Sequence, residues 1–149
     1  MPTSWPSLAR KSELWSGSWP DFIFDPKPSF ETVTGTFRDK ARAAGLPFEI
    51  EIFHLSGDAH DQSRFSRRVR VLDELIGREV WLPSAEDVIV TKLRWAERAK
   101  RGKDYEDVRD VTAVQGDAAL DWNYIHRWTA EHGTRTLLDQ IRASIPPID

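Results

Sequence analysis

The sequence contains no cysteine in its 149 residues. This absence excludes disulfide bonds, thiolate zinc sites and thiol nucleophiles, and it is typical of proteins that fold in a reducing compartment. The chain also has no run of about 18 apolar residues, and its first 20 residues lack the apolar segment of a signal peptide. We therefore expect a cytoplasmic protein that does not span a membrane.

Several sequence motifs of large enzyme classes are also missing. There is no glycine-rich phosphate loop, no Gly-x-Ser-x-Gly turn, no His-Glu-x-x-His zinc motif and no internal repeat. The net charge of −3 provides no general attraction to nucleic acid or to an anionic membrane. Binding to either would therefore need a local basic patch.

What is present is the composition of a folded domain, with 40% hydrophobic and 30% charged residues. The length suits one hydrophobic core, so we expect a single domain over residues 21–149. Residues 1–20 are rich in proline and serine and predict an irregular arm. Its tryptophans, Trp5, Trp15 and Trp19, are expected to pack against the core or to form the surface for a protein partner or a second copy of the chain.

Three short segments have strand patterns. The apolar run at residues 21–24 predicts a buried strand, the strict alternation at residues 48–54 predicts a half-buried strand, and residues 79–82 predict a last short strand. Between the first two, apolar residues at spacings of three and four predict an amphipathic helix over residues 29–44. Residues 56–70 are predicted to be a polar connection with at most one helical turn.

Everything after residue 83 has helical periodicity. Ser84 is expected to cap the first helix together with Asp87, and Asp121 to cap a later one. Further helices are expected over residues 104–115 and 134–145. Strands followed by helices predict an α+β fold: a small mixed sheet, with all strands before residue 83, followed by a helical C-terminal layer over residues 84–145.

Lys92 is expected at an inner position of the first of these helices, beside Ile89 and Leu93. An ammonium group without a partner would be costly there, so we expect it to reach Asp104 or Asp107 on the neighbouring helix. The alternative for this charged segment is a solvated ladder of ion pairs, each contributing about 0.3–0.5 kcal/mol.

The stretch "RFSRRVR" brings four arginines together at positions 64, 67, 68 and 70. Arginine binds phosphate groups through paired hydrogen bonds, so this patch is a candidate contact for nucleic acid. The alternative is a solvated loop.

The run from "LPSAEDVIV" to "GTRTLL" resembles the helical C-terminal half of bacterial minimal nucleotidyltransferase-like proteins, a group related to the nucleotidyltransferase toxins of abortive-infection systems. The resemblance covers residues 78–141. The matching positions are residues 83–87, Lys92, Lys103, Asp104, Asp107, Asp121, Tyr124 and Trp128.

This resemblance implies Mg²⁺-dependent transfer of a nucleotidyl group from a nucleoside triphosphate to a hydroxyl. Carboxylates in such a site hold the metal that neutralises the charge on the transferred group. The resemblance places Asp21 and Glu51 as the catalytic metal ligands. It places the nucleotide and phosphate contacts at Lys92, Lys103, Asp104 and Asp107.

The chain departs from the family pattern in its N-terminal part. Trp19 stands where the first aspartate of the metal-binding pair is expected, and Gly17-Ser18 lies too close to Asp21 to form the family's phosphate-holding turn. These losses predict a degenerate, truncated member that keeps a remnant of the nucleotide site. The alternative is a non-catalytic interaction or regulatory module, in a toxin-antitoxin or defence setting.

Overall fold

The structure is a computed structural model that describes residues 22–25, 27–33, 35–43, 45 and 47–146. It combines helices with small sheets, so the predicted α+β class is confirmed. The chain divides into two compact units, and each is described by itself. The sheet unit holds the described residues up to Phe30 and from Phe37 to His54, and the helical unit holds Glu31–Thr36 and the chain from Leu55 onward. That residues 21–149 form one domain stays a prediction.

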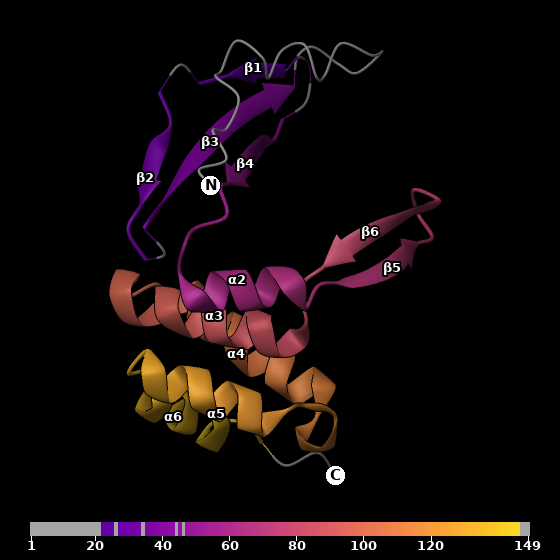
Figure 1. Cartoon of the computed structure of the whole chain (residues 1–149). Helices are drawn as coiled ribbons and strands as arrows, with labels where there is room; N and C mark the ends of the chain where they lie inside the picture. The colour runs from indigo at the N-terminus through magenta and orange to yellow at the C-terminus, as the bar shows by residue number, and fades with distance from the viewer. Residues whose placement is uncertain (1–21, 26, 34, 44, 46, 147–149) are drawn as a thin grey trace. The chain divides into compact units, whose positions relative to one another are not determined.

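The sheet unit is built around one long strand (Figure 1). Its strands are β1 (Phe22–Phe24), β2 (Ser29–Glu31), β3 (Thr36–Ala43) and β4 (Glu49–Phe53). Strand β3 pairs with β2 and, in antiparallel register, with β1 and β4. The strands predicted at residues 21–24 and 48–54 are thus present as β1 and β4.

The helix predicted over residues 29–44 is wrong, because this segment forms β2, a turn and β3. Gly35 has a φ of 70° in the turn, a conformation that glycine adopts without strain. Burial along β3 alternates from Asp39 onward, with Asp39, Ala41 and Ala43 buried and Lys40 and Arg42 more exposed. Phe30 and Phe37, which suggested the helical spacing, are 57% and 51% exposed. Pairing with β1 and β4 therefore overrides the local helical periodicity.

The helical unit begins with a short helix and a hairpin and ends with four packed helices (Figure 1). Its first elements are α2 (Ala59–Ser66), β5 (Val69–Asp73) and β6 (Arg78–Leu82). They are followed by α3 (Ala85–Ala99), α4 (Gly102–Gln115), the 3₁₀ turn η1 (Asp117–Ala119), α5 (Trp122–Glu131) and α6 (Arg135–Ala143). The strand predicted at residues 79–82 is β6. The predicted polar connection over residues 56–70 contains α2 and the first residues of the unpredicted strand β5.

Local capping signals explain where the C-terminal helices begin and end. The Ser84 side chain accepts a hydrogen bond from the Asp87 amide at the start of α3, and the Asp121 side chain accepts one from the Tyr124 amide at the start of α5. Helix α5 ends before Gly133, which has a φ of 70°. The amide of Thr134 then returns to the carbonyl of Thr129 at 2.8 Å, which completes the glycine-terminated cap.

Helices α3 to α6 enclose one apolar core. Its fully buried side chains are Ile89, Val90, Leu93, Val108, Ile125, Leu138 and Ile141. Burying each such side chain stabilises the fold by about 1.5–3 kcal/mol, which makes this core a rigid base for polar groups around it. None of the helices in the described residues is long and apolar enough to cross a membrane.

Candidate functional site

The Lys92 cluster joins helices α3 and α4. The Lys92 ammonium lies 3.0 Å from Asp104 Oδ1 and 2.6 Å from Asp107 Oδ2. Asp104 is fully buried, and its other oxygen lies 3.2 Å from Arg101 Nε. The pairing expected for Lys92 is therefore present, and it links the beginning of α4 to the middle of α3.

Electrostatics favour the charged forms of Lys92 and Asp107. Burial lowers the pKa of Lys92, but its hydrogen bonds to Asp107 and Asp104 outweigh burial and raise this pKa above the ordinary value. The hydrogen bond from Lys92 lowers the pKa of Asp107. Lys103 is exposed one residue before Asp104. A phosphate group would therefore meet Lys103 directly, but would have to compete with two carboxylates for Lys92.

Glu51 lies in a charge ladder on one face of the sheet unit. Its Oε1 is 2.9 Å from Arg38 Nη1 and 3.5 Å from Lys40 Nζ. Glu49 pairs with Lys40 at 2.6 Å and with Arg42 at 3.2 Å. The ladder follows from the antiparallel register, which places Lys40 opposite Glu51 and Arg42 opposite Glu49.

The ligand set for Mg²⁺ is incomplete in the described residues. Mg²⁺ is held by one or two carboxylates together with substrate phosphates, so Glu51 is a ligand of the right kind. However, its carboxylate already contacts two cations, and the part of the chain that the structure describes contains no group of three His, Asp or Glu residues able to hold a metal. Asp21, the other predicted ligand, lies outside the described residues. These residues therefore do not by themselves form a magnesium site.

The predicted site residues fall into two groups. Glu51 belongs to the sheet unit, whereas Lys92, Lys103, Asp104 and Asp107 belong to the helical unit. The structure brings Lys92, Asp104 and Asp107 together, and it describes Glu51 only with the basic side chains of its own sheet.

A buried network around Asp87 was not predicted beyond the helix cap. Tyr124 Oη donates to Asp87 Oδ1 at 2.6 Å, Ser84 Oγ donates to Oδ2 at 2.9 Å, and His60 Nε2 lies 3.3 Å from Oδ1. Arg67 Nε lies 3.4 Å from Oδ2 on the exposed side. Asp87 thus ties together α2, α3 and α5. Only the Ser84 cap could have been found locally, since His60 and Tyr124 lie far away in the sequence.

The protonation of this network is set by burial and by hydrogen bonds. Burial raises the pKa of Asp87, but the nearby His60 ring and hydrogen bonds from Tyr124 and Ser84 outweigh burial and lower it below the ordinary value. Burial and the hydrogen bond to Asp87 raise the pKa of Tyr124 to about 12. Asp87 is therefore a carboxylate and Tyr124 a hydrogen-bond donor at neutral pH.

A pair of imidazoles lies beside this network. The rings of His60 and His132 have centroids 5.4 Å apart, and His60 also packs edge-on against Trp128 at 5.0 Å. Burial, together with the charges of Arg94 and His60, lowers the pKa of His132 to about 4. His132 is therefore neutral in the folded protein at neutral pH.

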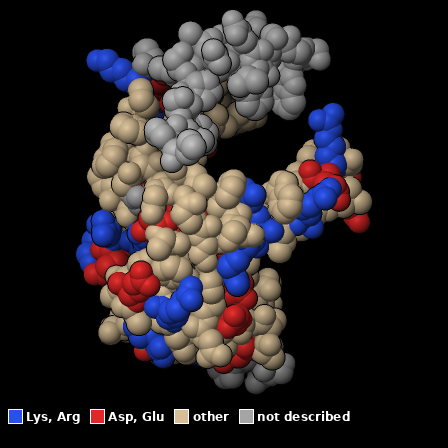
Figure 2. Space-filling model, viewed as in Figure 1, with Lys and Arg blue, Asp and Glu red and all other residues tan. Residues whose placement is uncertain are grey.

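Most of the arginine patch is already paired. Arg64 contacts Asp61 at 2.6 Å, Arg67 stacks on Tyr124 and contacts the Asp87 carboxylate, and Arg70 pairs with Glu79. Across the helical unit, basic and acidic side chains are interspersed on the face shown in Figure 2. The patch therefore does not offer four free cations to nucleic acid.

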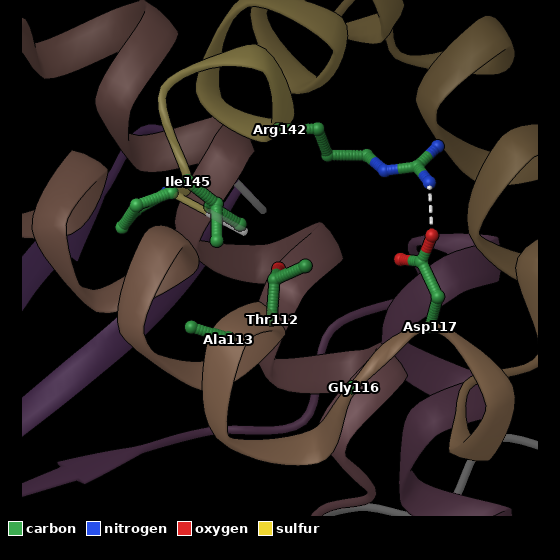
Figure 3. Close-up of a pocket in the computed structure, with 7 residues that line it drawn as sticks. Thr112, Ala113, Gly116, Asp117, Arg142 and Ile145 are labelled. Atoms are coloured by element: carbon green, nitrogen blue, oxygen red, sulfur yellow. Dashed lines mark hydrogen bonds and ion pairs between the residues drawn. The ribbon is translucent and has the colours of Figure 1, made fainter. Parts of the chain in front are cut away.

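Two surface cavities are lined by none of the predicted site residues. One, of about 410 Å³, lies at the C-terminal end of α4, where Arg142 Nη2 bonds to Asp117 Oδ2 at 2.9 Å (Figure 3). Another, of about 510 Å³, lies beside the turn between α3 and α4 and is lined by Lys100, Arg101 and Tyr105 among others. Neither is lined by the residues of the Lys92 cluster.

Comparison of the chain with protein-family models, with curated proteins and with solved structures found no match. The resemblance to nucleotidyltransferase-like proteins therefore rests on the sequence motifs alone.

Proposed function

We propose that the chain is a degenerate nucleotidyltransferase-like protein that retains a binding remnant for a nucleoside triphosphate with Mg²⁺. The observation that carries the proposal is the Lys92 cluster. Its lysine and two aspartates occupy the positions that the resemblance assigns to the nucleotide site, and the lysine ammonium lies within 3.0 Å of both carboxylates. The confirmed α+β class is consistent with such a protein.

In an active member of this class, Asp21 and Glu51 would hold Mg²⁺, and the metal would neutralise charge on the transferred phosphoryl group. The lysines and aspartates of the helical unit would bind and orient the nucleotide. Lys103 would contact phosphate from its exposed position, and Asp107 would orient the Lys92 ammonium at 2.6 Å. The replacement of the first metal-binding aspartate by Trp19 supports binding without efficient transfer.

The second candidate is a non-catalytic interaction or regulatory module in a toxin-antitoxin or defence setting. It is favoured by the mutual pairing of the charged groups, since Glu51 and Lys92 each contact two opposite charges of the protein itself. Trp5, Trp15 and Trp19, the predicted partner surface, lie outside the described residues. Nucleic-acid binding through residues 64–70 has the weakest support, because three of its four arginines have carboxylate partners.

A thermal-shift titration with the four ribonucleoside triphosphates, with and without Mg²⁺, tests the first candidate. A nucleotide at ten times its dissociation constant adds roughly 1.4 kcal/mol of stability. This increment is expected to raise the unfolding midpoint of the wild type by about 3–6 °C, in the presence of Mg²⁺ only. Glu51→Gln is expected to abolish the shift, because it removes the charged metal ligand but keeps the side-chain shape.

Glu49→Gln is the matched control, because Glu49 lies on the same strand and also pairs with Lys40. It should keep the nucleotide shift. A second pair, Lys103→Gln and Lys100→Gln, compares the predicted phosphate contact with another exposed lysine, and only the first should weaken the shift. No shift with any nucleotide would contradict the proposal and favour the interaction module.

A further inference from the structure

Strands β5 and β6 form a hairpin, which is a sheet of only two strands in the part of the chain that the structure describes. Its register places Arg70 opposite Trp81 and Leu72 opposite Glu79. Within the described residues neither strand pairs with a third one, and in Figure 1 the hairpin extends away from the ends of α2 and α3. An isolated two-stranded hairpin is at best marginally stable in water, whereas a sheet of three or more strands is stable.

Both faces of this hairpin expose apolar side chains. Alternation along the strands places Arg70, Leu72, Glu79 and Trp81 on one face, which we call the tryptophan face. Trp81 is 58% exposed and Leu72 is 61% exposed. The opposite face carries Val69, Val71, Val80 and Leu82. Such large exposed aromatic and aliphatic groups are typical of a surface that binds another protein.

The tryptophan face has one cation more than it has carboxylates. Arg70 pairs with Glu79. The Arg68 guanidinium lies 3.3 Å from the Phe65 ring centroid and 5.3 Å from that of Trp81. Arg68 Nε is buried without a hydrogen-bond partner, and no carboxylate of the described residues forms an ion pair with this arginine. A carboxylate placed beside Trp81 would therefore give Arg68 an ionic partner.

We propose that a second copy of this chain supplies that carboxylate, through antiparallel pairing of the two β6 strands about a twofold axis at Val80. A twofold axis perpendicular to the sheet pairs Val80 with Val80, Glu79 with Trp81, and Arg78 with Leu82 of the other copy. Each pair shares one face, because its members are separated by an even number of residues. The result is a four-stranded sheet.

Charge complementarity favours this arrangement. Glu79 of each copy lies opposite the other copy's Trp81, on which that copy's Arg68 is stacked. The two Glu79 carboxylates are diagonal neighbours that lie among four guanidinium groups, and each is shared between its own Arg70 and the other copy's Arg68. No like charges are directly opposite each other. Pairing through β5 at Val71 is less suitable, because it supplies no carboxylate to Arg68. This inference does not rest on the proposed function.

Sedimentation velocity over a range of protein concentrations tests the dimer. The wild type is expected to show a species of about twice the 17.1 kDa chain mass. Glu79→Arg should weaken the dimer at least tenfold, because it places six cations and no carboxylate at the two tryptophan faces. Glu74→Arg, which makes the same charge change in the hairpin turn, should leave the dimer intact. Circular dichroism checks that both variants fold.

The absence of cysteine allows a sharper test of register. Directly opposite residues of antiparallel strands have Cα atoms about 4.5–5.5 Å apart, which suits a disulfide. Val80→Cys is therefore expected to form an intermolecular disulfide rapidly under mild oxidation, and Leu75→Cys at the exposed turn is expected to form little. A wild type that stays monomeric at all concentrations, a dimer that survives Glu79→Arg, or equal crosslinking by the two cysteine variants would overturn the proposal.

Discussion

Replacing Asp87 with alanine is expected to lower the free energy of unfolding by about 3–5 kcal/mol, because it breaks a buried charged network. Asp87 is only 1% exposed and is the common partner of Tyr124 and Ser84. Its removal leaves the Tyr124 hydroxyl and the His60 ring buried with fewer partners. The three elements that meet at this carboxylate, α2, α3 and α5, would then lose their shared polar contact.

Urea denaturation of the wild type and of Asp87→Ala measures this effect. Asp110→Ala is the matched control, because Asp110 also lies on a helix and pairs with an arginine but has a side chain that is 64% exposed. It should change stability by less than about 0.5 kcal/mol. Asp87→Asn should lie between the two, because the amide keeps an acceptor for Tyr124 but loses the charge. A loss of less than 1 kcal/mol in Asp87→Ala would show that the network is not a main support of the fold.

Acidification from pH 6.5 toward pH 4 is expected to destabilise the protein by roughly 2 kcal/mol through His132 alone. The pKa of His132 is about 4 in the folded protein and about 6.5 when unfolded. Between these values the unfolded chain binds the extra proton, so stability falls as the pH falls through this window. The full difference between the folded and unfolded pKa values corresponds to about 3 kcal/mol of stability. Partial exposure of the ring to solvent reduces this contribution.

The physical cause is the surroundings of the ring. His132 faces Arg94 and Arg98 from α3, His60 from α2, and Asp58 at the start of α2. Asp58 opposes the other charges only in part, because both of its oxygens accept hydrogen bonds from Arg94 at 2.9 Å. Protonation of His132 would therefore add a cation to a group that is already basic.

Unfolding free energies at pH 7.0, 5.5 and 4.5 for the wild type and His132→Gln measure this contribution. Asp87 also has a lowered pKa and contributes to the loss at the acid end, so the quantity of interest is the difference between the two proteins at each pH. That difference is expected to shrink as the pH falls. Parallel pH profiles would show that His132 does not couple protonation to folding.

The helical half of the protein was predictable because its signals are local. Ser84 and Asp121 cap their helices, Gly133 ends one, and all act within about one helical turn. The partners of Lys92 were predictable for the same reason, since the two helices are joined by a short turn and an inward ammonium needs a carboxylate.

The sheets and the buried network depended on contacts between distant segments. Residues 29–44 have apolar spacing that suits a helix, but this segment forms β2 and β3 because β1 and β4 provide pairing partners for β3. The predicted metal ligand Glu51 could be assigned to a strand by alternation, whereas its pairing with Arg38 depended on the register of β3 and β4.

The sequence by itself therefore determined the α+β class, the C-terminal helices with their caps, and the carboxylate partners of Lys92. Only the tertiary structure decided the β2–β3 pairing, the ionic partners of Glu51, the network that joins His60, Asp87 and Tyr124, and the exposed β5–β6 hairpin. The physical reason is the distance along the sequence between the groups that interact. Caps and helical periodicity are set by residues within a few positions of each other, whereas strand pairing and buried hydrogen bonds depend on groups that come together only when the chain folds.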